Sequence, residues 1–575
     1  MRYKLIDGSM NDVNAVLDTV LRNRGVSESN KYLNLDDSCV EDYNNLSNIN
    51  EAIECFRNHF YNRDTIAILV DCDPDGYTSA AMMYLYIKSQ DPDYPVFYMI
   101  HQNNKAHGLS RMNSGDIEIP DGTKLLIVPD AGTNDTEQCN QLIDDGIDVI
   151  ILDHHEMEEV GKGNRAIIVN NQISPSYLNK DFSGAGVCYE FLKALDDIEW
   201  TTHADNCLDL VALAQVSDVM DLRSFPTRYY VNQGFKQIKN KMLQALIDAQ
   251  DYSMKSKINP TSVAWYCTPI LNAMIRIGSY EERELLFKAF IEDYEEFDYK
   301  KRTGEVVKEN IYDRTARLCK NAKSRQDKSR DKLYALLESK VNYDDKVVIV
   351  QEDTSDAGIV GLSAMKLADS IKRPVVVLRD IGHGKLGGSL RNYDNSPIED
   401  LKELLNQTGL FKSMGHANAA GAEIAKQDLQ AAKDMLNEQL KDIVYDNSYL
   451  CDFVLDFDEL DIGFVKDIDS YDWVWCTGIK EPIIAVTDIY VARKDIHVQG
   501  KEHNSVWFEH EGVKYVMFKM DSDNELLQFA ANNWGEGDDD EIVFDAVVTC
   551  SVNSYEGVLQ PQCIIKDINI TKQNN

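Results

Sequence analysis

The sequence predicts an α/β protein that ends in a β-rich domain. Four short apolar runs, each closing in polar residues, are separated by helix-length segments, which is typical of a parallel sheet with crossover helices. A second α/β pattern follows a basic helical stretch, and the last part of the chain alternates apolar and polar residues as strands do. At 575 residues the chain is too long for one hydrophobic core, so we expect three or four domains.

A helical segment precedes the first α/β region. VNAVLDTVLRNRG has an apolar spacing near 3.6 residues and ends at Gly25, so residues 10–60 are predicted to be helices with polar connections. The four apolar runs follow: TIAILVD (65–71), KLLIVPD (124–130), DVIILDHH (148–155) and AIIVNN (166–171). Further helices are predicted in 184–250 and 280–300. Ligand sites of such sheets form beyond the carboxyl ends of the strands.

A basic stretch separates the two α/β regions. Residues 304–340 have a helical pattern with few acids, so they are predicted to form a long, exposed connector. Its basic residues are Arg314, Arg317, Lys320, Lys323, Arg325, Lys328, Arg330 and Lys332. Beyond it, DKVVIVQED, a helix near 360–370, RPVVVLRD, the glycine-rich GHGKLGGSL and a helix before SMGHANAAG predict a second α/β domain. From about residue 450, alternation in IIAVTDIYVA, SVWFEH, VKYVMFKM and IVFDAVVTCSV predicts a small barrel, and Glu536 to Glu541 a solvated loop.

The composition limits the classes of partner. A net charge of −37 argues against loose, charge-driven binding of nucleic acid, although an acidic surface can coexist with a local basic groove. Twelve cysteines occur singly from Cys39 to Cys563 and never as CxxC pairs, which predicts reduced thiols and no zinc site. No basic and apolar leader opens the sequence, and no segment reaches the ~20 apolar residues of a membrane span. We therefore expect a cytoplasmic protein with no membrane partner.

Acids and histidines fall at the ends of the predicted strands. Three aspartates alternate at the end of the first run, one ends the second, and an Asp-His-His triplet ends the third; a further aspartate follows the apolar segment LVALAQVS. These residues are Asp71, Asp73, Asp75, Asp130, Asp153, His154, His155 and Asp218. If the strands are adjacent, all of these side chains meet at one edge of the sheet.

A group of carboxylates of this kind is unfavourable unless cations lie between its members. Hard oxygen ligands with an imidazole favour Mn²⁺ or Mg²⁺ over zinc. Two such ions, about 3.5 to 4 Å apart, would lower the pKa of a bridging water and stabilise both oxygens of an in-line phosphoryl displacement. Taken alone, DxDxDG is also typical of calcium loops and phosphotransfer sites. A His-His pair taken alone is also typical of ordinary surface or core histidines. The repeated placement at strand ends favours hydrolysis of a phosphate ester.

At these residues the sequence resembles the DHH phosphoesterases, a superfamily of pyrophosphatases, oligoribonucleases, cyclic-dinucleotide phosphodiesterases and RecJ exonucleases. The four motifs appear in family order as VDCDPDG, VPDAG, LDHH and VSDV. Other segments are similar to the RecJ branch, and they cover nearly the whole chain. They are FSGAGVCYEFLKAL (182–195), DLVALAQVSDVMDL (209–222), TRYYVNQGFKQI (227–238), TPILNAMIRIG (268–278), SMGHANAAG (413–421) and SYEGVLQPQCIIKDI (554–568).

The resemblance implies a domain order. Residues 1–60 would be the N-terminal helical part of the DHH module, 61–303 the DHH catalytic domain, 304–340 the connector helix and 341–448 a DHHA1 α/β domain. Residues 449–575 would form an OB-type β-barrel that binds nucleic acid.

The resemblance also implies roles for single residues. The metal ligands would be Asp73 and Asp130 for one Mn²⁺ or Mg²⁺ ion, and Asp75, Asp130, His154 and Asp218 for a second. His155 would lie near the attacked phosphate, with Asp71 in a supporting catalytic role. The residues that match family positions for binding a terminal phosphate are Arg276, Ser389, Arg391 and His416. Guanidinium forks suit phosphate oxygens, although Arg276 also fits a helix-surface arginine and His416 a capping or core residue.

Four positions depart from the family pattern. Gln102 stands where arginine is usual, so either Lys105 substitutes for it or one phosphate contact is missing. Ser355 and Asp356 replace a Trp-His pair, and Met414 replaces a glycine. These differences concern end preference and affinity more than the chemistry.

The predicted function is a single-stranded-DNA-specific 5′ to 3′ exonuclease in recombination, repair or replication. Candidates for base stacking are Trp507, Phe508, Tyr515, Phe518 and Tyr555, of which about half would face a barrel core. Because duplex DNA is too wide for a narrow channel, we expect a helicase and a single-strand-binding protein as partners. Two alternatives remain: an oligoribonuclease or small-nucleotide phosphoesterase of the same superfamily, and a non-catalytic replication scaffold.

Overall fold

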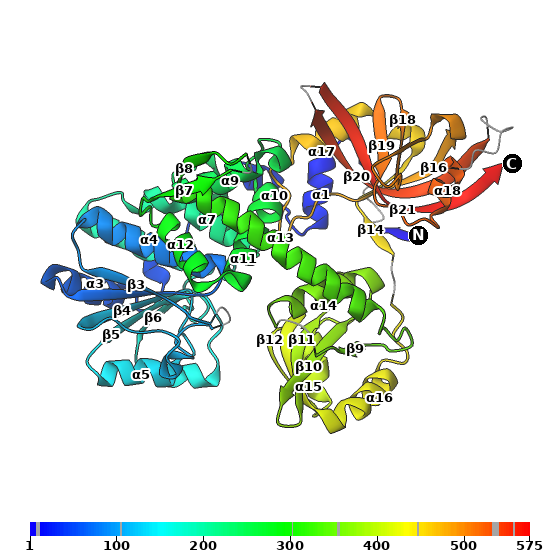
Figure 1. Ribbon diagram of the computed structural model, residues 1–575. Helices are drawn as coiled ribbons and strands as arrows, with labels where there is room; N and C mark the ends of the chain where they lie inside the picture. The colour runs from blue at the N-terminus through cyan, green and yellow to red at the C-terminus, as the bar shows by residue number, and fades with distance from the viewer. Residues whose placement is uncertain are drawn as a thin grey trace. The chain divides into compact units, whose positions relative to one another are not determined.

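The chain forms two compact units in the computed structural model (Figure 1). The first contains Met1–Ile275, Ser279–Arg317 and Ser448–Asn575; the second contains Arg276–Gly278 and Leu318–Asn447. The structure describes residues 1–6, 12–103, 106–301, 303–353, 357–445, 448–531, 540–555 and 558–574, with only the backbone of 357, 555 and 572–574. Lys105, Ser355, Asp356 and most of the predicted acidic loop lie outside these ranges.

A five-stranded parallel sheet forms the framework of the first unit. Its order is β3-β2-β4-β5-β6, with every neighbouring pair parallel. The strands are β2 (Thr65–Val70), β3 (Val96–Ile100), β4 (Thr123–Pro129), β5 (Asp148–Asp153) and β6 (Ile167–Asn170). β2, β4 and β5 each contain five successive buried residues, as strands covered on both faces do. The four predicted runs are confirmed, and β3, which was not among them, adds an edge strand with an exposed Phe97.

Helices cover this sheet and extend beyond it. They are α3 (Ile49–Asn62), α4 (Pro74–Gln90), α5 (Thr136–Asp144), α6 (Gly184–Glu199), α7 (Leu208–Ser217), α8 (Phe225–Lys236), α9 (Lys241–Met254), α10 (Pro260–Ser262), α11 (Thr268–Ile277) and α12 (Tyr280–Phe290). α4 and α7 are buried along most of their length, and α4 packs against α6 and α7 as well as on β2. A short π-helix, Val263–Cys267, joins α10 to α11. Among the residues that the structure describes, every helix is too short or too polar to span a bilayer.

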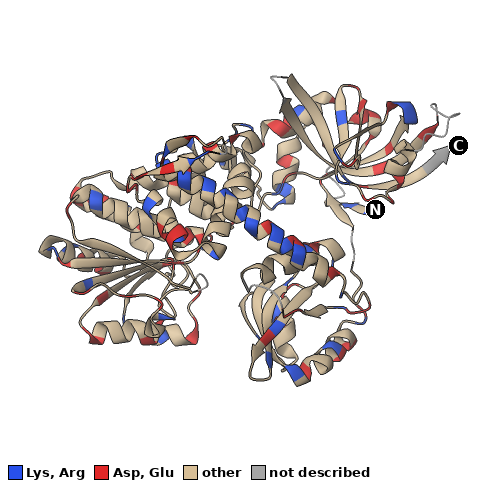
Figure 2. Cartoon of the chain, in the orientation of Figure 1, with Lys and Arg blue, Asp and Glu red and all other residues tan. Residues whose placement is uncertain are grey.

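The connector helix begins later than predicted. Residues before it form an antiparallel hairpin of β7 (Glu296–Lys300) and β8 (Val306–Asn310), in which each residue of one strand is paired with one of the other. The helix α13 then runs over Ile311–Glu338 and carries many of the basic residues seen along it in Figure 2. It is not simply exposed, since Ala316 and Cys319 are buried. Several of its cations are also paired, as in the two hydrogen bonds from Arg317 to Glu309.

The second unit contains a five-stranded sheet of order β12-β13-β11-β10-β9. Its strands are β9 (Val348–Gln351), β10 (Val375–Gly382), β11 (Lys385–Arg391), β12 (Phe411–His416) and β13 (Ala419–Ala425), and only β9 and β10 are parallel. The helices are α14 (Ala357–Ile371), α15 (Leu401–Gln407) and α16 (Leu429–Gln439). The glycine-rich segment forms the turn into β11 and part of that strand, while SMGHANAAG forms the β12–β13 hairpin.

The C-terminal sheet is open, so the predicted OB-type barrel is not confirmed. Its order is β15-β16-β20-β21-β19-β18-β17, and the two edge strands do not pair with each other in the described part of the chain. The strands are β15 (Phe453–Asp456), β16 (Ile484–Ala492), β17 (His497–Gln499), β18 (Ser505–His510), β19 (Val513–Met517), β20 (Glu541–Tyr555) and β21 (Val558–Asn574). Helices α17 (Ile462–Ser470) and α18 (Glu525–Ala531) contribute apolar side chains to its core, which explains how the core is filled without closure.

The N-terminal segment divides between two cores. α3 packs on the first sheet, but Leu17 and Leu21 of α1 (Val16–Asn23) belong to the core of the C-terminal sheet. β1 (Tyr3–Leu5) pairs in parallel with β14 (Tyr449–Cys451), and Tyr32 of α2 (Ser29–Leu33) lies in the same core. The first residues of the chain therefore complete the C-terminal domain.

Candidate metal centre

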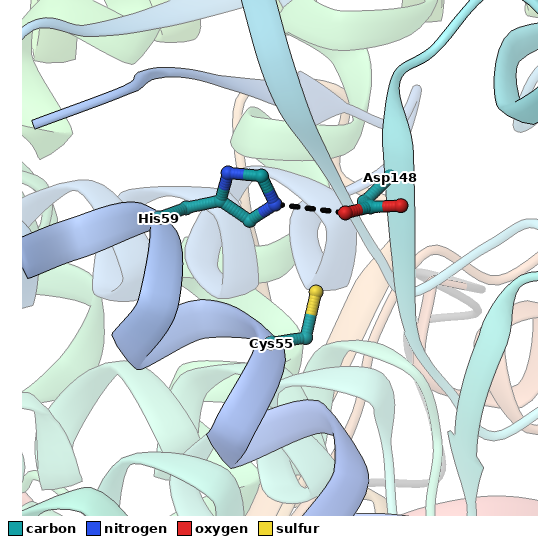
Figure 3. Close-up of side chains that lie close together, drawn as sticks. All are labelled: Cys55, His59 and Asp148. Atoms are coloured by element: carbon teal, nitrogen blue, oxygen red, sulfur yellow. Dashed lines mark hydrogen bonds and ion pairs between the residues drawn. The ribbon is translucent and has the colours of Figure 1, made fainter. Parts of the chain in front are cut away.

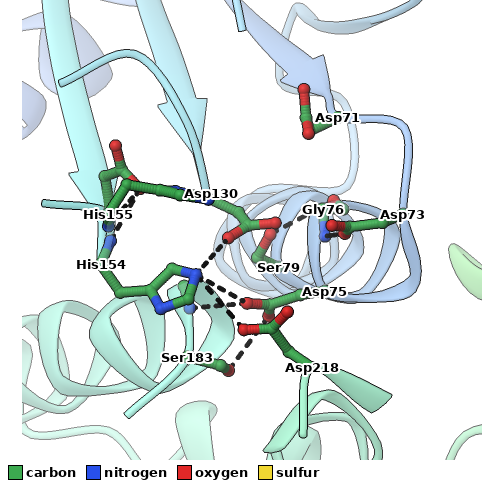
Figure 4. A network of polar contacts seen from close by, with 12 residues as sticks. Asp71, Asp73, Asp75, Gly76, Ser79, Asp130, His154, His155, Ser183 and Asp218 are labelled. Atoms are coloured by element: carbon green, nitrogen blue, oxygen red, sulfur yellow. Dashed lines mark hydrogen bonds and ion pairs between the residues drawn. The ribbon is translucent and has the colours of Figure 1, made fainter. Parts of the chain in front are cut away.

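The predicted acids and histidines meet at the carboxyl edge of the first sheet (Figure 4). Asp71 follows β2, Asp130 follows β4, Asp153 ends β5, and His154 and His155 come next. Because all five strands are parallel, these ends share one edge. Three groups at this edge have ligand atoms within 4.8 Å of one another: Asp71, Asp73 and Asp130; Asp75, His154 and Asp218; and Asp130, His154 and His155.

The start of α4 places Asp73 and Asp75. Asp73 caps the helix, with its Oδ1 accepting a hydrogen bond from Gly76 N at 2.8 Å, and Pro74 occupies the first helical position. A methyl group on Gly76 would lie 2.6 Å from Asp71 Cβ, so glycine is needed where the helix passes the strand end. The DCDPDG motif thus encodes both a helix start and two side chains at the sheet edge.

Asp75 is held by the N-terminus of α6. Its Oδ2 accepts from Gly184 N at 2.7 Å, and its Oδ1 accepts from Ala185 N at 2.8 Å and Ser183 Oγ at 3.1 Å. Helix N-termini favour negative charge through their free amide groups. This contact explains the FSGAG segment that precedes α6.

Asp130 lies at the middle of the site. Its side chain is 1% exposed, and neither carboxylate oxygen accepts a hydrogen bond from any described group. His154 Nε2 lies 3.2 Å from Asp130 Oδ1, 3.5 Å from Asp218 Oδ2 and 3.8 Å from Asp75 Oδ2. A buried carboxylate without donors is costly unless a cation accompanies it. The oxygen-rich donor set with one imidazole fits Mn²⁺ or Mg²⁺.

The protein alone disfavours the charged forms of these acids. Burial, together with the charges of Asp71 and Asp75, raises the pKa of Asp73 to about 6. Burial and the charges of Asp75 and Asp73 raise the pKa of Asp218 to about 8 and that of Asp130 well above its usual range. Burial also lowers the pKa of His154, which keeps the imidazole neutral. A divalent cation binds neutral imidazole and ionised carboxylates, and its positive charge would stabilise the ionised form of these acids.

Asp71 contacts a histidine that was not predicted from the sequence. His107 Nδ1 lies 2.7 Å from Asp71 Oδ2, and Gly108 N donates to Asp71 Oδ1 at 2.7 Å. The charge of Asp71 raises the pKa of His107 to about 10, and the His107 ring lies 4.8 Å from that of His155. For Asp71 itself, burial raises the pKa, but the charge and hydrogen bond of His107 together with the hydrogen bond from Gly108 N–H outweigh burial, so the pKa is lowered. The HG pair in HQNNKAHGLS was the available signal.

His155 is oriented by Asp153. Its Nδ1 lies 2.8 Å from Asp153 Oδ1, whose carboxylate also accepts from His154 N and Thr133 N. Although burial opposes it, the hydrogen bond with Asp153 raises the pKa of His155. Asn170 Nδ2 donates to the His155 carbonyl at 2.9 Å and fixes the backbone. With Nδ1 engaged, the Nε2 atom remains for a ligand.

Three of the predicted phosphate-binding residues share one face of the second unit's sheet: Ser389, Arg391 and His416. Arg391 and His416 both pair with Ala419, and Ser389 pairs with Gly421. Burial and the charge of Arg276, which belongs to the same unit, lower the pKa of Arg391. Met414 pairs with Gly421 on that face and is 64% exposed. Three of the four predicted phosphate-binding residues therefore lie on one surface. The fourth, Arg276, is close enough for its charge to act on Arg391.

The candidates for base stacking are divided between the buried core and the opposite face of the sheet, because adjacent residues of a strand point to opposite faces. Phe508 and Tyr515 are 1% and 0% exposed and stack on each other at 5.1 Å in the core, so the prediction that they contact bases is wrong. Trp507 faces the other side of β18, where His497 lies 4.1 Å from its ring and Lys514 Nζ 4.0 Å. Phe518 is exposed. The side chain of Tyr555 lies outside the described residues.

Comparisons with known proteins agree with this geometry. The family model "DHH family, N-terminal domain" matches residues 65–215, and the model "DHHA1 domain" matches residues 344–442. A protein of the SPbeta prophage in Bacillus subtilis, provisionally named the single-strand DNA-specific exonuclease YorK, is 36% identical over 585 aligned residues, covering 100% of this chain and 99% of YorK. The RecJ exonuclease of Bacillus subtilis is 22% identical over 94% of this chain and 66% of its own length. The chain belongs to the RecJ branch of the DHH family.

A solved RecJ structure supports the fold of this RecJ-type chain. Thermus thermophilus RecJ in complex with Mn²⁺ has a TM-score of 0.73 at 18% identity, covering 99% of this chain and 79% of the Thermus chain. The DHH model spans the acids and histidines from Asp71 to His155, and Asp218 follows three residues after its end. The DHHA1 model spans Ser389, Arg391 and His416.

Proposed function

We propose that this chain is a metal-dependent exonuclease that hydrolyses phosphodiester bonds of single-stranded DNA from the 5′ end. The observation that carries the proposal is Asp130, a buried carboxylate whose two oxygens lack any described hydrogen-bond donor and which has further acids close by. The relatives named as single-strand DNA-specific exonucleases support the substrate class.

The residues fit two divalent cations. Asp73 and Asp130 would hold one Mn²⁺ or Mg²⁺ ion, with Asp130 shared by a second. The second set is Asp75, Asp130, His154 and Asp218, whose three carboxylates surround His154 Nε2. The Thermus structures of RecJ with Mn²⁺ and with Mg²⁺ support this choice of metal. When bound, such ions supply an activated water and neutralise charge on the attacked phosphate.

The protein's own groups orient the reacting phosphate. Because Asp153 engages His155 Nδ1, the Nε2 atom of His155 is left to donate a hydrogen bond to a phosphate oxygen. Asp71 would act indirectly, since its two oxygens hold His107 and the backbone of Gly108 beside His155. His107 is therefore a second candidate for contact with the phosphate.

The second unit would select the DNA end. Ser389, Arg391 and His416 present a hydroxyl, a guanidinium and an imidazole on one sheet face, and these groups suit a terminal phosphate. With Arg276, they would bind a 5′ phosphate and make cleavage start at that end. Release of nucleoside monophosphates would follow.

The C-terminal domain would guide the strand rather than cut it. Trp507, with Lys514 over its ring, offers an aromatic surface beside a positive charge. Because the substrate is single-stranded, we expect a helicase and a single-strand-binding protein to act with this nuclease in recombination, repair or replication.

An end-specific nuclease assay tests the proposal. Wild-type protein and Asp130→Asn are compared with Mn²⁺ on labelled single-stranded and double-stranded DNA, each with and without a 5′ phosphate. We expect wild type to degrade the phosphorylated single strand fastest and Asp130→Asn to lose turnover. Equal digestion of duplex and single strand, or digestion from the 3′ end, would contradict the proposal.

A further inference from the structure

A cysteine, a histidine and an aspartate meet at the opposite end of the first sheet (Figure 3). Cys55 and His59 are one turn apart on α3 and so lie on the same face of the helix. Asp148 is the first residue of β5, whereas the candidate metal centre follows the last residue of that strand, Asp153. Five residues of a strand span about 17 Å, so this group is separate from that centre.

The three side chains have the proximity of metal ligands. One ligand atom from each of Cys55, His59 and Asp148 lies within 4.8 Å of the other two. His59 Nε2 is 2.9 Å from Asp148 Oδ2, and in Figure 3 the thiol of Cys55 points toward this pair. A thiolate, an imidazole and a carboxylate together are the donors that zinc takes.

A second carboxylate orients the imidazole. Asp64 Oδ2 lies 2.9 Å from His59 Nδ1, at the other side of the ring. Histidine ligands of metals usually donate their other ring N–H to such a carboxylate, which directs the free lone pair to the ion. In the tautomer with its hydrogen on Nδ1, the Nε2 lone pair of His59 faces an oxygen of Asp148, and a cation between the two would accept electron pairs from both.

Little movement is needed to admit an ion. Zinc bonded to nitrogen and oxygen at about 2.0 to 2.1 Å in tetrahedral geometry holds these two atoms about 3.3 Å apart. The present separation of 2.9 Å therefore has to grow by a few tenths of an ångström. The side chain of Asp148 is 61% exposed and can move outward without disturbing the core.

We propose that Cys55, His59 and Asp148 bind a zinc ion that fastens α3 to the start of β5. Water would take the fourth position, or Glu51, which lies one turn before Cys55 on the same helix face. Binding releases the Cys55 thiol proton to solvent as the sulfur–metal bond forms. No motif in the sequence indicates this site, because its residues are spread over helix and strand and form no CxxC pair.

Cobalt titration of the full-length protein tests the site. Excess Mg²⁺ is added first to occupy the carboxylate-rich centre, which has no thiol ligand among its predicted residues, and Co²⁺ is then titrated while thiolate-to-cobalt absorption is recorded. We expect this absorption in wild type and its loss in Cys55→Ser. Cys72→Ser is the matched control, because Cys72 is another half-buried thiol and follows Asp71. No absorption in wild type, or loss in Cys72→Ser with retention in Cys55→Ser, would overturn the proposal.

Zinc affinity and folding give a second readout. Asp64→Asn keeps all three ligands but removes the orienting carboxylate, so zinc affinity should fall about 10- to 100-fold. Zn²⁺ should raise the melting temperature of wild type under the same Mg²⁺ excess and leave that of Cys55→Ser unchanged, with circular dichroism confirming that both are folded. An equal rise in both proteins would show that zinc acts elsewhere and would refute the site.

Discussion

Gly184 at the start of α6 lies directly against Asp130. A methyl group on Gly184 would be 2.6 Å from both Cβ and Oδ1 of Asp130, closer than any side chain tolerates. The same glycine donates its N–H to Asp75. Gly184 thus sets the separation between the carboxylates of Asp75 and Asp130, which are both proposed ligands of the second metal ion.

Gly184→Ala should therefore impair metal binding without removing a ligand. A displacement of about 1 Å in such a site can cost about 100-fold in rate, so we expect a loss of that order in Mn²⁺-dependent turnover and weaker Mn²⁺ binding by calorimetry. Gly163→Ala is the matched control, because a methyl group on Gly163 would lie 3.4 Å from its nearest neighbour, Thr136 Cγ2. Wild-type Mn²⁺ affinity in Gly184→Ala would show that the contact is unimportant.

The stability of the metal-free protein should fall as the pH rises. Burial and the charges of Asp75 and Asp73 raise the pKa of Asp218 from 3.8 to about 8 on folding. A carboxyl of this kind stabilises the fold fully below its unfolded pKa, and the contribution is lost as the pH rises through the folded value. Melting curves with EDTA from pH 5 to pH 8 should show a smaller fall for Asp218→Asn than for wild type. A wild-type curve that is flat or rising relative to the variant would be inconsistent with this account.

Gly361 in α14 should control recognition of the 5′ phosphate. A methyl group there would lie 2.6 Å from Arg391 Nη2 and 3.5 Å from Ser389 Oγ, so Gly361→Ala should displace the guanidinium. Loss of a charged hydrogen bond to phosphate should raise KM for 5′-phosphorylated DNA about 10- to 100-fold, with less change in kcat. DNA with a 5′ hydroxyl is the internal control, and an equal rise in its KM would contradict a role in phosphate binding.

Arg228 should join α8 to the C-terminal domain. It is fully buried, and its guanidinium donates to the carbonyls of Val474 at 3.2 Å and Trp473 at 2.5 Å. Arg228→Met would leave both carbonyls without this donor, which should cost about 2 to 4 kcal/mol in the free energy of unfolding. Denaturant titration measures the loss, with Lys236→Met, an exposed position on the same helix, as control. A midpoint equal to that of the control would exclude the predicted role.

The position of the carboxylate centre could be predicted because it follows from strand ends. In a parallel sheet every carboxyl end reaches the same edge, so Asp71, Asp130 and His154 had to converge once their apolar runs were assigned to strands. His107 could not be found in this way, because it lies in an irregular segment after β3 and reaches Asp71 by the path of the chain rather than by any periodicity.

Three errors arose from information that the local sequence does not contain. Trp507 and Phe508 are neighbours in one strand, and a shift of one residue exchanges the face that each occupies, so the buried member could not be identified. Barrel closure depends on whether distant edge strands meet, and here helices from other parts of the chain complete the core instead. The start of α13 was also misplaced, because the β8 residues before it belong to a hairpin.

The shared core of the two chain ends imposes an order on biosynthesis. Asn23 donates a hydrogen bond to Asp452, 429 residues later, and Arg24 pairs with the same carboxylate. Leu17 and Leu21 thus leave the ribosome long before their packing partners are translated. The apolar face of α1 stays without these partners until the residues up to β15 have been synthesised, and any variant that stops before β15 leaves that face exposed.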